Sequence, residues 1–79
     1  MNITYARAAI KTLKKMPAKD RDALRSKLKR YAETGEGDVK KLQGRSEYRL
    51  RHGDWRALFE VRDGVVVLKV AHRREAYGG

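Results

Sequence analysis

Residues 48–61 read YRLRHGDWRALFEV, and this stretch decides the fold. Apolar and charged side chains alternate along both of its halves, and Gly53 and Asp54 divide the halves as a turn. A period of two is typical of strands that are buried on one face only. The stretch therefore predicts two antiparallel strands, residues 48–52 and 55–61, with one face toward a core and the other toward solvent.

The sequence that follows predicts a third strand. Asp63 and Gly64 form a two-residue hairpin signal between flanks rich in β-formers. Residues 65–71 read VVVLKVA and are apolar on both faces, which favours a central position in the sheet. Consecutive antiparallel strands are thus expected between residues 48 and 71.

The sequence before residue 48 has mainly helical periodicity. Residues 2–5 predict a short first strand, and a helix follows over residues 6–16, which Pro17 ends because proline disfavours a helical conformation in the residue before it. A second helix begins at about Ala18 and ends at Gly35, a residue suited to the left-handed conformation after a helix. The apolar stripes expected to face the core are Ala6, Ala9, Ile10 and Leu13 on the first helix and Leu24, Leu28, Tyr31 and Ala32 on the second.

The segment between the helices and residue 48 completes the predicted architecture. Residues 34–45 contain three glycines and are predicted to form a loop, which Val39 and Leu42 attach to the core. Two helices cannot bury their apolar stripes alone, so they pack together on one face of the sheet. The predicted fold is α+β, with the order β-α-α-β-β-β. It is a small, mostly antiparallel sheet with an N-terminal helical hairpin on one face, in a single domain over residues 1–79.

The strong positive charge restricts the function. The 79 residues include 20 Lys and Arg against 10 Asp and Glu, which gives a formal net charge of +10. Such a charge destabilises a small domain through self-repulsion, and the binding of a polyanion is the usual reason for it. We therefore favour a nucleic acid or an acidic protein as partner over a merely solvated basic surface.

The composition argues against several other classes of function. The chain has no Cys and only two His, so neither a disulfide framework nor a zinc cluster is expected, and we predict no metal and no cofactor. The N-terminal residues contain no apolar run long enough for a signal peptide or a membrane span. The protein is expected to be cytoplasmic and to bind no membrane.

Strand parity predicts where the charged side chains lie, because consecutive side chains on a strand point to opposite faces. The helix-covered face is expected to take Tyr48, Leu50, Trp55, Ala57, Phe59 and Val61, together with Val66, Leu68 and Val70. The open face then receives Arg49, Arg51, Arg56, Lys69, Ala71 and Arg73. Arginine suits phosphate because its planar guanidinium donates two parallel hydrogen bonds. Glu60 is the only acid expected on this face, so we favour a phosphate site over a solvated face.

Metal-independent cleavage of RNA fits such a cluster. The reaction needs a base for the 2′-hydroxyl, positive charge at the phosphorane and an acid for the leaving 5′-oxygen, and arginine can supply the positive charge. Tyr77 could stack on a base or serve as a core contact, and the sequence leaves both open. The parity of His72 places it with Val70 on the core side, which favours a structural role, and His52 is expected to serve the turn at Gly53.

Several segments of the chain, in order and spacing, resemble the RelE branch of the RelE/ParE toxin superfamily. They are Lys41-Leu42-Gln43-Gly44, residues 48–61, and Ala71-His72-Arg73-Arg74-Glu75-Ala76-Tyr77. The helical hairpin matches as well, so the resemblance covers nearly the whole chain. It implies a type II toxin that enters the ribosomal A site and cleaves mRNA there through attack of the 2′-hydroxyl, leaving a 2′,3′-cyclic phosphate. It also implies an acidic cognate antitoxin that inhibits the toxin and, together with it, binds operator DNA.

The resemblance also assigns roles to residues. It implies that Arg56 stabilises the phosphate in the transition state, that Arg73 protonates the leaving group and that Tyr77 stacks on a base. Arg49 matches a basic catalytic position on the strand that lines the site. The other cations expected to bind RNA are Arg51, Lys69, Arg74, Lys40 and Lys41.

Departures from the family pattern leave alternatives open. Some relatives use a lysine pair where this chain has Glu47 and Arg49, and arginine is a poor base because it stays protonated. The candidate bases are therefore Glu47, His72 and Lys40. The chain ends at Gly79 without the additional C-terminal helix of some relatives. The alternatives to an mRNA endoribonuclease are a ParE-like poison of DNA gyrase and a catalytically inactive RNA-binding toxin.

Overall fold

The computed structural model describes residues 1–76 of the chain. Its strands are β1 (Ile3–Tyr5), β2 (Val39–Lys41), β3 (Tyr48–His52), β4 (Trp55–Val61) and β5 (Val65–His72). Its helices are α1 (Arg7–Lys15) and α2 (Ala18–Thr34), between β1 and β2, and the short α3 (Arg73–Ala76) after β5. None of the helices within these residues is long and apolar enough to cross a lipid bilayer.

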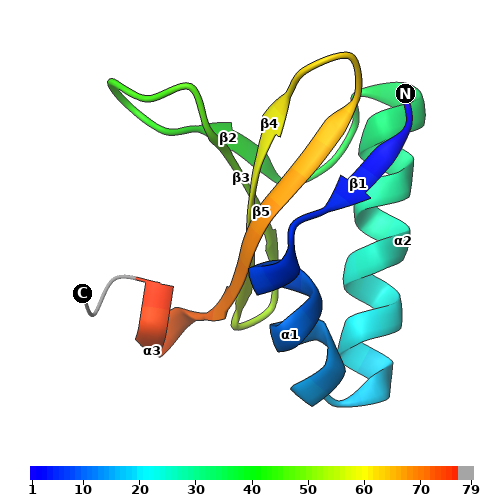
Figure 1. The fold of residues 1–79 in the computed structure, drawn as a ribbon, viewed down its shortest axis with the longest axis vertical. Helices are drawn as coiled ribbons and strands as arrows, with labels where there is room; N and C mark the ends of the chain where they lie inside the picture. Colours follow the sequence, from blue (N-terminus) through cyan, green and yellow to red (C-terminus); the bar gives the residue numbers. More distant parts are fainter. Residues whose placement is uncertain (77–79) are drawn as a thin grey trace.

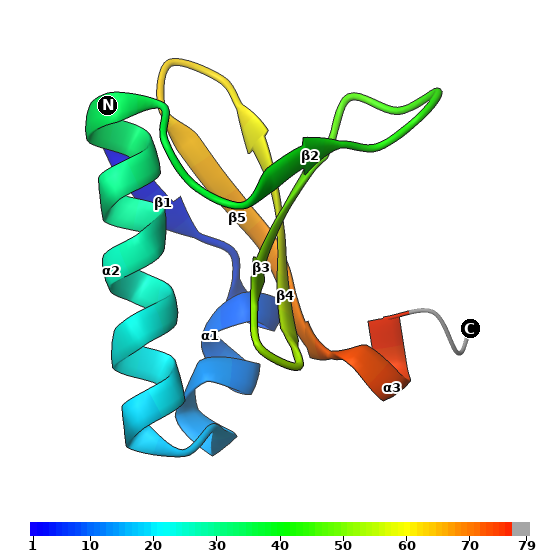
Figure 2. The same ribbon diagram turned by 180° about the vertical axis from the view of Figure 1, so that it is seen from behind.

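The strands form one twisted sheet with the order β1-β5-β4-β3-β2 (Figure 1). β1 runs parallel to β5, and all the other neighbouring pairs are antiparallel. The helices α1 and α2 lie together on one side of this sheet, as both views show (Figures 1 and 2). The predicted α+β fold, with a mostly antiparallel sheet, a central last strand and a helical hairpin on one face, is thus confirmed.

The helical hairpin follows the predicted boundaries closely. α2 ends at Gly35, which adopts a left-handed φ of 77° and donates its N–H to the carbonyl of Tyr31 at 2.8 Å. The stripe on α1 is only partly as predicted, because Ile10 is 41% exposed whereas Met16, just after the helix, is buried. Ile10 lies at the flank of the stripe, and a helix this short cannot turn all its apolar side chains inward.

The loop prediction for residues 34–45 is wrong for residues 39–41. Residues 39–41 form β2, an edge strand whose register partners on β3 are Leu50, Arg49 and Tyr48. A strand this short shows no alternation that could be read from sequence, and pairing with β3 supplies its hydrogen bonds instead. The pairing extends the open face of the sheet by one strand.

The core lies between the sheet and the two long helices. Its fully buried large side chains are Leu24 and Leu28 of α2 together with Leu50, Phe59, Val65, Val67 and Val70 of the sheet. The predicted core set of β5 is therefore wrong for Val66 and Leu68, which are only partly buried. Parity predicts Val61 on the covered face, yet this last residue of β4 is 43% exposed.

A register shift explains the error in β5. Leu58 of β4 pairs with Lys69 of β5, but the next residue, Phe59, pairs with Val67. The extra residue of β5 at this bulge reverses the parity of the preceding residues. Val65 and Val67 consequently face the helices, while Val70 beyond the bulge does so as well.

Candidate active site

A cavity of about 300 Å³ lies on the open face of the sheet, away from the helices. Its lining consists of Leu42, Gln43, Arg45, Arg49, Arg56, Leu58, Lys69 and Ala71. Four of these residues are cations and none is an acid. The strand register explains the grouping, because Arg49 is paired with Leu58, Leu58 with Lys69, and Arg56 with Ala71. Parity therefore predicted the strand-borne part of this cavity, including Arg49, Arg56, Lys69 and Ala71.

The connection between β2 and β3 supplies the part of the lining that the sequence did not predict. Both ribbon views show this connection projecting on the side of the sheet away from α1 and α2 (Figures 1 and 2). The backbone N–H of Leu42 donates to the carbonyl of Glu47 at 3.0 Å, and the N–H of Arg45 donates to the carbonyl of Leu42 at 3.2 Å. These bonds fold the segment back so that Leu42, Gln43 and Arg45 reach the cavity. Only the basic and apolar character of residues 41–45 hinted at this role.

Arg56 is held at the cavity by hydrogen bonds to the backbone. Its Nη1 donates hydrogen bonds to the carbonyl oxygens of Gly53 at 2.8 Å and of Trp55 at 3.0 Å. Its Nε is buried and has no hydrogen-bond partner among residues 1–76. The β3–β4 turn thus fixes the guanidinium at the cavity, and donors remain for an incoming anion.

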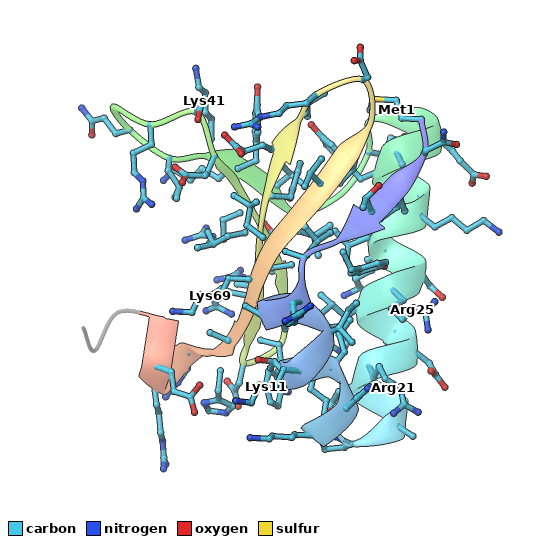
Figure 3. The ribbon with its side chains drawn as sticks, in the orientation of Figure 1. Met1, Lys11, Arg21, Arg25, Lys41 and Lys69 are labelled. Carbon is cyan, nitrogen blue, oxygen red and sulfur yellow. The ribbon has the colours of Figure 1, made fainter. Side chains whose placement is uncertain are left out.

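Lys69 reaches the cavity because of the bulge in β5. Figure 3 shows its side chain on the side of the sheet opposite to α1 and α2. The residue is exposed, and its register partner Leu58 provides the apolar surface beside it. A lysine stem packs against apolar surface while its ammonium stays in water. The site thus combines cations with an apolar floor.

Other predicted site residues lie outside the cavity lining. Arg51 pairs with Asp38, its Nε lying 3.1 Å from Oδ2, and Arg73 lies near Asp54, with its Nε 3.8 Å from Oδ1. Arg74 is exposed on α3. Tyr77 lies outside the described residues. The parity argument placed Arg51 and Arg73 on one face with Arg56. Arg51 is the register partner of Arg56 and shares that face without lining the cavity, whereas Arg73 begins α3.

The two lysines of β2 have different surroundings. Lys40 is the register partner of Arg49, so it shares the open face next to the cavity without lining it. Lys41 is paired with Tyr48 and borders a separate cleft with Glu60 and Arg62. Lys41 thus does not line the cavity, and the expected contact of both lysines with RNA stays a prediction.

The candidate bases are separated by the structure. His72 is the register partner of Trp55 and packs against it with the ring centroids 5.2 Å apart, so it lies on the helix-covered face as parity predicted. Glu47 accepts hydrogen bonds from Nε and Nη2 of Arg45 at 2.8 and 3.2 Å. The hydrogen bond from Arg45 lowers the pKa of the Glu47 carboxyl below its ordinary value. Of the three, Glu47 and Lys40 lie beside the cavity and His72 does not.

The residues that the structure describes contain no group of three or more His, Cys, Asp or Glu side chains suited to holding a metal ion. The chemistry that the lining of the cavity offers is that of its four cations. An anion placed on the apolar floor between Arg49, Arg56 and Lys69 would receive charge from two sides of the cavity.

The family is decided by comparison of the sequence. Residues 3–77 match the model of the family described as the ParE toxin of the type II toxin–antitoxin system parDE. The chain belongs to the ParE toxin family. It is thus a type II toxin of the RelE/ParE superfamily, as the resemblance predicted. No curated protein matched the chain in the sequence comparison.

Solved structures of RelE toxins have the same fold as this member of the ParE toxin family. The chain is similar to the toxin–antitoxin complex RelB–RelE from Methanococcus jannaschii, with a TM-score of 0.80, 26% identity and 95% of both chains covered. It is also similar to the isolated RelE toxin of E. coli, with a TM-score of 0.77, 25% identity, 96% of this chain and 89% of that chain covered. The intact RelBE complex of E. coli gives a TM-score of 0.73 at 26% identity, over 89% of this chain and 93% of that chain.

Proposed function

We propose that this toxin is a ribosome-dependent endoribonuclease that cleaves mRNA by attack of a 2′-hydroxyl on the adjacent phosphate. The observation that carries the proposal is the cavity on the open face, where Arg45, Arg49, Arg56 and Lys69 surround an apolar floor with no acid in the lining. The likeness to solved RelE toxins over nearly the whole chain supports it.

The geometry suits the charge that develops during RNA cleavage. The attack adds negative charge to the phosphate oxygens, and a preorganised cation stabilises that charge more than a mobile one does. Arg56 is preorganised by its two bonds to the β3–β4 turn. Arg49 lies on β3 and Lys69 on β5, the strands at either side of β4. Together with Arg56 they would surround the phosphate. In this proposal Arg73 acts from the start of α3 on the leaving 5′-oxygen, and Tyr77 stacks on a base.

The base is proposed from the two groups that remain beside the cavity. Glu47 has the charge of a proton acceptor, and the hydrogen bond from Arg45, which lowers its pKa, makes it a weak one. Lys40 is the register partner of Arg49 and places a cation next to the cavity. We propose Glu47 as the base, with Lys40 as a cation that contacts the RNA.

An acidic antitoxin is the expected protein partner. The formal charge of +10 attracts a polyanionic protein as readily as RNA. The similar RelE chains from M. jannaschii and E. coli were solved in complexes with RelB antitoxins. We propose that a cognate antitoxin binds this toxin in the same way, that the complex recognises operator DNA through the antitoxin, and that the toxin acts in the cytoplasm.

Inhibition of DNA gyrase is the second candidate function. The observation that favours it is the family model, which describes ParE toxins rather than RelE toxins. The cavity does not serve it, because a protein that traps gyrase needs no site for a scissile RNA phosphate.

Primer extension after induced expression separates the two candidates. An abundant message is mapped in two forms, one translated and one with its start codon removed. Cleavage at in-frame positions of the translated form alone supports the proposed nuclease. Growth arrest with intact messages and relaxed or broken DNA would favour gyrase inhibition instead, and an absence of arrest would indicate an inactive toxin.

A further inference from the structure

The β3–β4 turn contacts both of the arginines to which the proposed mechanism gives a role in phosphate chemistry. Gly53 accepts the hydrogen bond from Nη1 of Arg56 at 2.8 Å. The next residue, Asp54, accepts the backbone N–H of Arg73 on its carbonyl oxygen at 2.6 Å. Two adjacent residues of one turn therefore hold a side chain from β4 and the start of α3.

The carboxylate of Asp54 faces the same segment. Its Oδ1 lies 3.8 Å from Nε of Arg73, and its Oδ2 lies 3.9 Å from Nε2 of His72. His72 in turn accepts the backbone N–H of Arg74 on Nδ1 at 3.3 Å, which caps the first turn of α3. With Nδ1 engaged as an acceptor, a neutral His72 carries its proton on Nε2, toward Asp54.

We propose that Asp54 is a positioning residue of this toxin, which orients Arg73 at the start of α3 through its carboxylate and its backbone carbonyl. The inference rests on the proposed nuclease function. Because Nε of Arg73 faces Asp54, the two Nη groups remain to meet a phosphate or a leaving oxygen. The side chains of Arg73 and Asp54 are 64% and 60% exposed, so their pairing contributes little to the stability of the fold. The effect of the pair is to orient the guanidinium of Arg73.

Asp38 offers a matched control for Asp54. Its Oδ2 lies 3.1 Å from Nε of Arg51, and its side chain is 56% exposed. Both acids lie near the Nε of an arginine, although Asp38 accepts a hydrogen bond from Arg51 and the Asp54–Arg73 distance is longer. Arg51, however, lies outside the lining of the cavity. Loss of the Asp38 carboxylate removes one charge and its pair with Arg51, whereas loss of the Asp54 carboxylate removes one charge and its contacts with Arg73 and His72. Of the two arginines, only Arg73 has a role in the proposed cleavage step.

The test is the rate of mRNA cleavage by purified toxin on ribosomes programmed with a short message, measured for Asp54→Asn, Asp38→Asn, Arg73→Ala and the double variant Asp54→Asn/Arg73→Ala. Asn retains the backbone carbonyl and the shape of the side chain. We expect Asp54→Asn to lower kcat about 10- to 100-fold with KM unchanged, since a small misplacement of a reacting group has effects of that order. Asp38→Asn should stay within about twofold of wild type, because rim charges of this kind contribute little. Asp54→Asn should have no further effect in the Arg73→Ala background, and Asp54→Glu should recover part of the rate.

Each result either supports or overturns the inference. Equal rates for the Asp54 and Asp38 variants, a faster Asp54→Asn toxin, or an Asp54→Asn effect that persists without Arg73 would overturn it while leaving the nuclease function intact. A wild-type toxin that cuts no message in this assay would overturn the proposed function, and the role of Asp54 with it. Thermal unfolding of each variant shows whether a lost rate reflects a lost fold.

Discussion

Leu58 of β4 is the register partner of Lys69 of β5, whereas Phe59, the next residue of β4, pairs with Val67. This bulge lets β5 satisfy two demands that a regular strand cannot meet together. Val67 and Val70 are both buried against the helices, although side chains three residues apart on a regular strand point to opposite faces. Lys69 nevertheless faces the cavity on the other side of the sheet. The core and the proposed active site thus depend on the same irregularity.

Replacement of Arg56 by Ala should abolish the activity while preserving the fold. We expect cleavage to fall at least about 100-fold, as it does when a preorganised donor to a developing negative charge is removed. The loss of two exposed or partly buried hydrogen bonds to the turn should cost only about 1–2 kcal/mol of stability. Cleavage is measured on programmed ribosomes, and stability by urea denaturation. Lys27→Ala, on the exposed face of α2, is the control, and an Arg56→Ala toxin as active as that control would show that the cavity is not the active site.

Removal of the Lys69 charge should weaken RNA binding in a salt-dependent manner. Each phosphate contact contributes about one unit to the slope of log K against log salt, so Lys69→Met should reduce that slope by about one. Fluorescence anisotropy with a short single-stranded RNA over a range of salt concentrations gives the slope. Lys27→Met, on the exposed face of α2, removes the same charge from the other side of the molecule. Equal slopes for the two variants would contradict a specific role for the open face.

Truncation of a buried leucine should show where the core lies. Leu28 is fully buried, and Leu28→Ala should destabilise the protein by about 2–5 kcal/mol, because it removes apolar contacts and leaves a cavity. Ile10 is 41% exposed on the neighbouring helix, so Ile10→Ala should cost less than about 1 kcal/mol. Urea denaturation of both variants provides the comparison. A larger loss at Ile10 than at Leu28 would mean that α1 and α2 present other faces to the sheet.

Two glycines should respond differently to replacement by Ala. At Gly64, with φ of +150°, an added Cβ would lie 2.8 Å from the carbonyl oxygen of Asn2, which itself accepts the N–H of Val65. At Gly53, with φ of +55°, an added Cβ would meet nothing within 4 Å. We expect Gly64→Ala to cost more than about 2 kcal/mol and Gly53→Ala about 1 kcal/mol. Unfolding free energies in urea test this order, and a cost at Gly53 that equals or exceeds the cost at Gly64 would reverse it.

The Arg45–Glu47 pair should make stability depend on pH in one direction. Because the pKa of Glu47 is lowered in the folded protein, the pair stabilises the fold at pH values above the ordinary glutamate pKa of about 4.3. This contribution disappears as the pH falls through the lowered pKa. The difference in Tm between wild type and Glu47→Gln should therefore be present at pH 6 and shrink toward pH 3, to within the precision of the scan. A difference that grows on acidification would contradict the assignment.

The parts of the fold that carry a periodic signal could be predicted from the sequence. The helices around Leu24 and Leu28, the hairpin at residues 48–61 and the left-handed Gly35 were all confirmed. The strand β2 could not be predicted, since three residues are too few to show a period. The bulge in β5 could not be predicted either, because a run of valines has no alternation from which a change of face could be read.

The residues of the candidate site also divide into those that could be predicted from the sequence and those that could not. Parity brought Arg49, Arg56 and Lys69 to one face, since these residues stand on strands with a clear register. Arg45 reaches the cavity only through the folding of the β2–β3 connection, which leaves no pattern in the sequence. The separation of Arg73 from the cavity depends on the point at which β5 ends and α3 begins. That point is set by the contact with Asp54, a tertiary interaction that periodicity does not reveal.

The central claim is that the open face cleaves mRNA through a 2′-hydroxyl, and one substitution in the substrate tests it most directly. Ribosomes are programmed with a message whose A-site codon is either all ribose or carries a single 2′-deoxynucleotide on the 5′ side of the scissile phosphate, and purified toxin is added. We predict cleavage of the ribose message, with a 2′,3′-cyclic phosphate at the new end, and no cleavage at the deoxy position. Equal cleavage of both messages would contradict attack by the 2′-hydroxyl. Cleavage of neither message by a toxin that still arrests growth would contradict the nuclease function altogether.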